Sequence, residues 1–136
     1  MKQRLTRGFT LIEILTVVVI VGVLTAAALP SYFNSVRDVR LRAAESNARA
    51  IATAVQTLQT KSGGRGYTGL NLANTEVLRE LNNAVPVNEC AAASIQSNTG
   101  GWLVQISGSG DTVWTISPRD SSLCTSKPLT ITLGGP

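Results

Sequence analysis

One apolar stretch, Phe9–Leu29, constrains the fold of this chain more than any other feature. Its polar side chains are those of Thr10, Glu13, Thr16 and Thr25. A helix of this length measures about 31 Å, which is enough to cross the hydrocarbon core of a bilayer. The stretch therefore predicts an α-helix that can span a membrane.

Glu13 separates three interpretations of this stretch. A plain membrane anchor gains nothing from it, since a charge at the centre of a membrane helix costs about 2.5–3.5 kcal/mol, and less near the end. A secretory signal peptide, with residues 26–28 (Ala-Ala-Ala) as its cleavage site, would also function better without a carboxylate. Cleavage between Gly8 and Phe9 gives Glu13 a role, because the new α-amine could be neutralised by the carboxylate of a neighbouring copy.

The residues around this junction read Arg-Gly-Phe-Thr-Leu-Ile-Glu over positions 7–13, between a short basic leader and the apolar stretch. In these residues the chain resembles the type IV pilin family. The leader of residues 1–8 and the Phe at the cut resemble the type IVa branch. Pro30 falls where such pilins often carry a proline that kinks the helix. The motif is specific for the superfamily, which also includes minor pilins, competence pilins and the pseudopilins of type II secretion.

The resemblance implies a processing and assembly pathway. A prepilin peptidase would cleave after Gly8 and N-methylate Phe9, and Glu13 would be the carboxylate that guides assembly. The precursor would cross the bacterial inner membrane once, with its N-terminus in the cytoplasm. An inner-membrane platform protein and its ATPase would then extrude an extracellular pilus built from copies of this chain, which would serve adhesion, twitching motility or DNA uptake.

Beyond the apolar stretch a helical pattern continues. Pro30 lacks an N–H and clashes with the carbonyl four residues earlier, so it is expected to kink or break the helix. Residues 31–61 contain no further Pro or Gly. Most charged side chains lie off the apolar stripe, and we expect pairs such as Arg42 with Glu45 on a solvated face. The stripe has spacings of mostly three and four and consists of Val36, Ala44, Ala48, Ile51, Val55 and Leu58.

The helix is expected to end in the glycine-rich residues 61–69, where Gly63 or Gly64 can supply the C-cap. This stretch is a poor candidate for a phosphate-binding loop, because no G-K-[ST] follows it. A short helix is predicted at residues 75–83, with Asn74 or Thr75 as its N-cap.

The charge of the chain gives little support for nucleic-acid binding. The formal net charge is +4, but three of the twelve basic residues lie in the leader; without them nine basic and eight acidic residues remain. Lys61, Arg65 and Tyr67 form a cation and aromatic group that could contact DNA. A solvated loop is the simpler expectation for these three residues.

From residue 100 the apolar period changes to two, which is typical of β-strands. Trp102, Val104 and Ile106 share one face of the first predicted strand, and residues 113–116 form the second. We expect Trp102 and Trp114 to lie in the core rather than to form a ligand platform. A small sheet cannot bury its apolar face alone, so it is expected to pack on the stripe of the long helix.

A third strand is predicted at residues 128–133, with Leu129, Ile131 and Leu133 facing inward. The predicted fold class is α+β: a long N-terminal helical spine packed against an antiparallel sheet of three or more strands. The expected divisions are a leader at 1–8, an apolar helix at 9–30, its amphipathic half at 31–62, and an αβ-loop, sheet and disulfide-bounded C-terminal region at 63–136.

Cys90 and Cys124 do not form a C-x-x-C motif. In a chain exported across a membrane they are expected to form one structural disulfide, which would contribute roughly 3–4 kcal/mol by closing a loop of about 35 residues. This pairing also resembles the disulfide-bounded region near the C-terminus of pilins. The chain contains no His and no visible catalytic constellation, so we expect no enzyme activity, no cofactor and no metal site.

Two alternatives stay open. Within the superfamily, the chain could be a pseudopilin of type II secretion or a minor or competence pilin, although the expected disulfide favours a pilus on the resemblance alone. Outside the superfamily, cleavage after Ala28 would release a secreted binding domain whose mature chain begins at Leu29.

Overall fold

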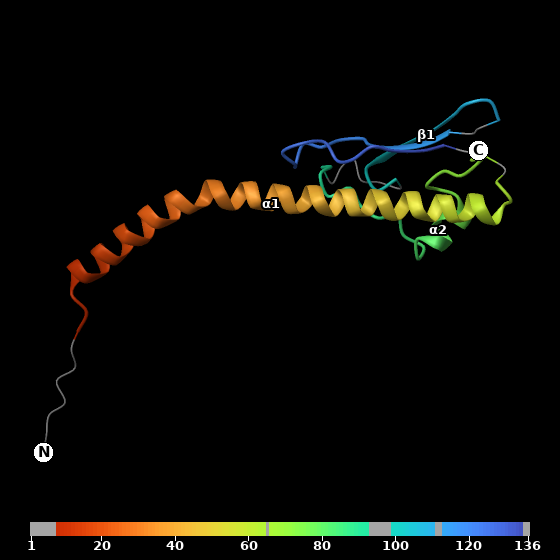
Figure 1. The fold of residues 1–136 in the computed structure, drawn as a ribbon. Coiled ribbons are helices and arrows are strands. Elements are labelled where there is room, and N and C mark those ends of the chain that lie inside the picture. Colours follow the sequence, from red (N-terminus) through yellow and green to blue (C-terminus); the bar gives the residue numbers. More distant parts are fainter. Residues whose placement is uncertain (1–7, 65, 93–98, 111–112, 135–136) are drawn as a thin grey trace, which may run out of the picture. The chain divides into compact units, whose positions relative to one another are not determined.

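The computed structural model describes residues 8–64, 66–92, 99–110 and 113–134. The chain forms two compact units, Met1–Ser35 and Val36–Pro136. A long helix, α1 (Leu11–Lys61), supplies most of the described part of the first unit and continues into the second. The second unit also contains a short helix, α2 (Thr75–Glu80), and a three-stranded sheet (Figure 1). The predicted α+β fold class is thereby confirmed.

The helix α1 runs through Pro30 without interruption. Of the two effects predicted for this proline, a break therefore does not occur. The helix ends at glycines, as expected. Gly63 has φ +79°, its N–H donates to the Thr60 carbonyl at 3.1 Å, and the Gly64 N–H donates to the Gln59 carbonyl at 3.0 Å. These two bonds form a Schellman motif, which satisfies carbonyls that the helix end would otherwise leave unpaired.

The sheet consists of β1 (Trp102–Ser107), β2 (Val113–Pro118) and β3 (Ile131–Gly134), which are antiparallel and lie in the order β1-β2-β3. The predicted alternation holds in β1 and β2, where Trp102, Trp114 and Ile116 are fully buried. The third strand begins later than predicted, because its pairing with β2 starts at Ile131. Leu129 therefore precedes the strand and is 39% exposed, so its predicted inward orientation is wrong.

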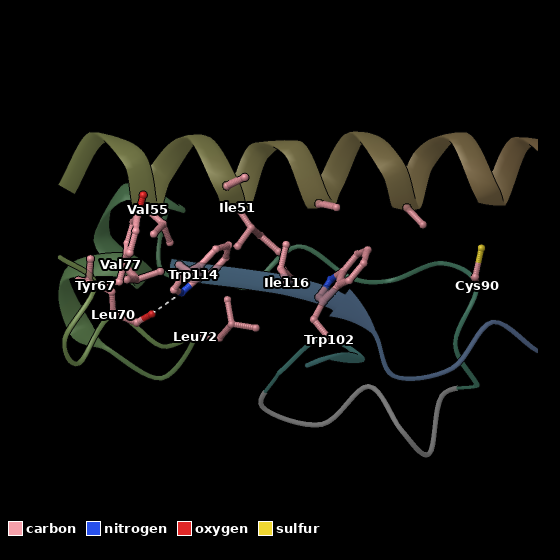
Figure 2. Packing of buried hydrophobic residues seen from close by; sticks show 13 residues of the cluster. Ile51, Val55, Tyr67, Leu70, Leu72, Val77, Cys90, Trp102, Trp114 and Ile116 are labelled. Carbon is pink, nitrogen blue, oxygen red and sulfur yellow. Dashed lines mark hydrogen bonds between the residues drawn. The ribbon is translucent and has the colours of Figure 1, made fainter. Parts of the chain in front are cut away.

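The core of the second unit lies between one side of α1 and one face of the sheet (Figure 2). Ala44, Ala48, Ile51 and Val55 of α1 are fully buried there, which confirms the predicted stripe over these four positions. At the ends of the stripe, Val36 and Leu58 are half-buried.

The two tryptophans lie in this core, as predicted, and each indole N–H has a hydrogen-bond acceptor. Trp102 Nε1 donates to the Pro86 carbonyl at 2.9 Å. Trp114 Nε1 donates to the Leu70 carbonyl at 2.7 Å (Figure 2). Because both polar groups are satisfied, the rings can be buried without an unpaired donor. Each bond also joins a strand to the loops between α1 and the sheet.

The short helix α2 starts at the predicted cap. Asn74 accepts a hydrogen bond from the Glu76 N–H at 2.8 Å, as an N-cap side chain does. Val77 is the buried residue of this helix. The helix ends at Glu80, before the predicted end at 83, because Asn82 and Asn83 adopt positive φ angles of 57° and 61°.

Cys90 and Cys124 form a disulfide, with their Cα atoms 5.1 Å apart, which confirms the expected pairing. Next to it lies the fully buried side chain of Asn88. Asn88 Nδ2 donates to the Asp120 carbonyl at 2.9 Å and to the Gly101 carbonyl at 3.2 Å, while its Oδ1 accepts from the Cys90 N–H at 3.1 Å. This one amide therefore joins the disulfide region to both ends of the β1–β2 hairpin.

Candidate functional site

The Gly8–Phe9 junction precedes α1 and makes no packing contact that would require a glycine. A Cβ atom added at Gly8 would have no neighbour within 4 Å among the described residues, and its φ lies outside the left-handed region. Phe9 is 78% exposed. Nothing in the described part of the chain therefore requires a glycine at this position.

Glu13 lies in the first turn of α1. Its N–H donates to the Thr10 carbonyl at 3.1 Å, which places the carboxylate near the positive end of the helix dipole. Within the described part of the chain this carboxylate has no ion-pair partner. The ion pair seen there joins two other residues, Lys61 and Glu80. Among the described residues, Glu13 is therefore a carboxylate on an apolar segment that no cation neutralises.

The apolar part of α1 is exposed on all sides. Every residue from Gly8 to Ser35 is exposed, and an 18-residue window of this helix has a mean hydropathy of 2.6 with 0% of it buried. By length and composition α1 is able to cross a membrane. A monomer in water could not keep so much apolar surface exposed, so this segment must be covered by lipid or by other protein.

The threonines of this segment are compatible with an apolar environment. Thr16 Oγ1 donates to the Ile12 carbonyl at 3.1 Å and to the Glu13 carbonyl at 3.0 Å, and Thr25 Oγ1 donates to the Val21 carbonyl at 2.8 Å. The hydroxyls of Thr16 and Thr25 are thus satisfied inside the helix. Composition could have pointed to this, since Ser and Thr often bond to the preceding turn in helices.

The loop residues considered for DNA binding do not come together as a surface. Tyr67 is 1% exposed and belongs to the core, where burial raises the pKa of its phenol. Lys61 Nζ donates to Glu80 Oε1 at 2.6 Å, and Arg65 lies outside the described residues. Within this group, Lys61 is therefore already paired, and the ring of Tyr67 is not available for stacking on a base.

Two further expectations concern charged residues. Arg42 and Glu45, both described, do not form the expected ion pair, so that prediction is wrong. Across the described ranges, no three acidic or cysteine side chains are grouped as ligands for a metal ion. Asp120 is instead occupied locally: it accepts hydrogen bonds from the Ser122 hydroxyl at 2.7 Å and the Ala92 N–H at 3.2 Å, and these hold the pKa of its carboxyl below the usual 3.8.

Comparison with known proteins shows what the chain is similar to. Residues 3–29 match the family model described as a prokaryotic N-terminal methylation motif. A type IV major fimbrial protein, FimA of Dichelobacter nodosus, is 40% identical over 75 residues, which is 52% of this chain and 48% of that protein. A second FimA from the same species is 36% identical over 74 residues, 53% of this chain and 47% of that protein.

A relative from another system is similar over a shorter stretch. The type II secretion system core protein G of Pseudomonas aeruginosa is 40% identical over 55 residues, 40% of this chain and 39% of that protein. The chain spans about half the length of the fimbrial relatives that it matches. No solved structure matches the chain.

Proposed function

We propose that the chain belongs to the type IV pilin superfamily, which includes the pseudopilins, and that it is a structural subunit of a type IV pilus. A prepilin peptidase cleaves the precursor between Gly8 and Phe9 and methylates the new N-terminus of Phe9. The cleaved subunit then enters a helical filament of identical subunits. The fimbrial relatives and the methylation motif support this proposal.

One observation carries the proposal: the apolar part of α1 is exposed on all sides, and its single carboxylate, Glu13, has no ion-pair partner among the described residues. In lipid, the charge of Glu13 and that of a free α-amine are both unfavourable. When Glu13 of an incoming subunit meets the amine of Phe9 in a subunit already assembled, the two charges become one satisfied pair. A buried pair of this kind can also select one axial stagger between helices. Head-to-tail addition then gives an open filament and not a closed ring.

The proposal includes a cellular route. Before assembly the chain is a single-pass protein of the bacterial inner membrane, with its N-terminus in the cytoplasm and residues 36–136 outside. The basic residues of the leader suit this orientation. An inner-membrane platform protein and its ATPase extrude the filament, which carries out adhesion, twitching motility or DNA uptake.

The test replaces the carboxylate of Glu13. Glu13→Val keeps the helix apolar, so we expect normal cleavage at Gly8–Phe9 but almost no filaments sheared from the cells. The matched control is Glu89→Val, which removes an exposed carboxylate of the second unit and should leave filament yield unchanged. Wild-type filament yield from the Glu13→Val variant would show that the carboxylate does not pair during assembly.

A pseudopilin of type II secretion is the second candidate function, favoured by the similarity to core protein G. The two functions make different predictions for a strain that lacks this chain. A pilin predicts loss of surface filaments with normal protein secretion. A pseudopilin predicts loss of type II secretion, with surface filaments retained.

A further inference from the structure

The apolar part of α1 ends at two neighbouring aromatic residues. Tyr32 and Phe33 are 64% and 55% exposed, and their rings meet edge to face, with centroids 5.9 Å apart and planes at 64°. Leu29, one turn earlier, is also exposed. The three side chains form one patch, because residues three and four apart lie on the same side of a helix. Among the described residues, the Tyr32 hydroxyl has no hydrogen-bond partner.

The composition of the helix changes at this patch. Residues 14–36 carry no charge, but the last part of this run is no longer purely apolar. Ser31, Asn34 and Ser35 flank the two aromatic residues, and Ser35 Oγ donates to the Ser31 carbonyl at 3.0 Å. Aromatic rings beside small polar groups, at the end of an apolar span, are typical of the boundary between a membrane and water.

We propose that Tyr32 and Phe33 anchor the precursor in the headgroup region of the outer leaflet and thereby set the depth of α1 in the membrane. This inference rests on the proposed function, since it requires the precursor to span the inner membrane. The ring of Phe33 and the ring face of Tyr32 contact the acyl chains near the headgroups. The Tyr32 hydroxyl lies on the water side of this boundary, where it can bond to water or to a phosphate.

The length of the helix connects this anchor to the cleavage site. From Leu11 to Tyr32 a helix rises about 32 Å, close to the hydrocarbon thickness of about 30 Å. Fixing Tyr32 at the outer interface therefore places the residues before Leu11 at the inner one. The bond between Gly8 and Phe9 then lies where a peptidase with a site at the cytoplasmic face can reach it. In the absence of the anchor the uncharged helix could slide, since residues 14–36 contain no charge to oppose movement.

The test measures the depth of the full-length precursor in the membrane of a host that lacks prepilin peptidase. Single cysteines are introduced by Val18→Cys, Ala28→Cys and Asn34→Cys, and cells are treated with a membrane-impermeant maleimide from outside. The native Cys90 and Cys124 do not react, because they form a disulfide. In the otherwise native chain we expect Asn34→Cys to be labelled, and Ala28→Cys and Val18→Cys to be protected.

Two double variants should move this boundary in opposite directions. Tyr32→Ser with Phe33→Ser removes the anchor and leaves a polar segment, so labelling of Ala28→Cys should rise several-fold. Tyr32→Leu with Phe33→Leu replaces interfacial side chains by ones that prefer the hydrocarbon, so labelling of Asn34→Cys should fall several-fold. The matched control is Val39→Ser, which changes an exposed apolar residue of the same helix and should leave both rates unchanged.

The outcomes separate this inference from its premise. If Val18→Cys is labelled in the otherwise native chain, the helix does not span the membrane, and the proposed function fails together with the anchor. If Val18→Cys is protected but neither double variant shifts the boundary, the anchor is overturned and the proposed function stands. If the double variants also lose filaments in a host that retains prepilin peptidase, and the labelling shows no shift, the aromatic pair is assigned to contacts between subunits, which also overturns the anchor.

Discussion

At the scale of single residues, glycine is present for two different reasons. Gly100 has φ +61°, and a Cβ atom there would lie 2.8 Å from the Pro86 carbonyl oxygen, so the fold itself requires glycine. Gly8 has neither constraint within the described chain. In the proposed pathway, glycine at this position is needed by the peptidase that cuts after it.

Replacing Gly8 by Val tests that distinction. We expect the variant to fold and insert normally but to remain uncleaved, because the added side chain obstructs the peptidase and meets nothing in the chain. The matched control is Gly22→Ala, whose added Cβ also has no neighbour within 4 Å; it should be processed at the wild-type rate. The measurement is the mass of the N-terminal peptide. Processing of Gly8→Val at the normal bond would contradict the assignment of the cleavage site.

Gly100→Ala should destabilise the second unit. Any residue other than glycine in the left-handed region costs about 1–2 kcal/mol, and the overlap with the Pro86 carbonyl adds about 1–3 kcal/mol. Gly69→Ala is the control, since Gly69 has φ +74° but an added Cβ meets nothing within 4 Å. The measurement is the free energy of unfolding of the full chain, from denaturant titration in detergent. We expect Gly69→Ala to lose only the cost of the left-handed backbone conformation. Equal losses for the two variants would show that the loop at Gly100 relaxes.

At the scale of secondary-structure elements, α1 has two parts with different surroundings. The first is exposed over its whole circumference, whereas the second buries one stripe against the sheet. Ile51→Ala should therefore lower the free energy of unfolding by about 2–5 kcal/mol, because Ile51 is fully buried in this stripe. Val39→Ala, at a position 66% exposed on the same helix, should change it by less than about 0.5 kcal/mol. Similar effects of the two changes would contradict the packing described for α1.

The elements themselves follow from the sequence where the apolar period is regular. The stripe at Ala44, Ala48, Ile51 and Val55 and the alternation in β1 both specify which face is buried. The pattern misplaced Leu129, because apolar alternation does not show where backbone pairing with a neighbouring strand begins.

Contacts between segments far apart in the sequence could not be predicted from local residue patterns. Tyr67 lies in a glycine-rich stretch, which suggests solvent, yet its hydroxyl donates to the carbonyl of Gly134 at 3.4 Å and its ring is buried. The buried amide of Asn88 is a similar case, since its partners at Gly101 and Asp120 lie far along the chain. Such residues are fixed by the tertiary arrangement. Glu13, by contrast, could be singled out as a candidate from the sequence itself, because a carboxylate in an apolar stretch is anomalous, and its role in assembly stays a prediction.

At the scale of the whole molecule, the two units differ in how much apolar surface they leave exposed. The described residues of the second unit share a core, and the Cys90–Cys124 disulfide joins two of their loops. In the proposed pathway, the apolar part of α1 is first surrounded by lipid and later by other copies of the chain. Exposure of the amine of Phe9 is the covalent event that we propose as the trigger for this change.

The most direct test of this account is the intact mass and N-terminal peptide of the chain isolated from its native host. The account predicts a mature chain that begins with N-methylated Phe9 and contains Cys90 and Cys124 as a disulfide. A mature chain that begins at Leu29 would contradict it. The apolar helix would then be a discarded signal peptide, and the function would have to be sought in residues 36–136.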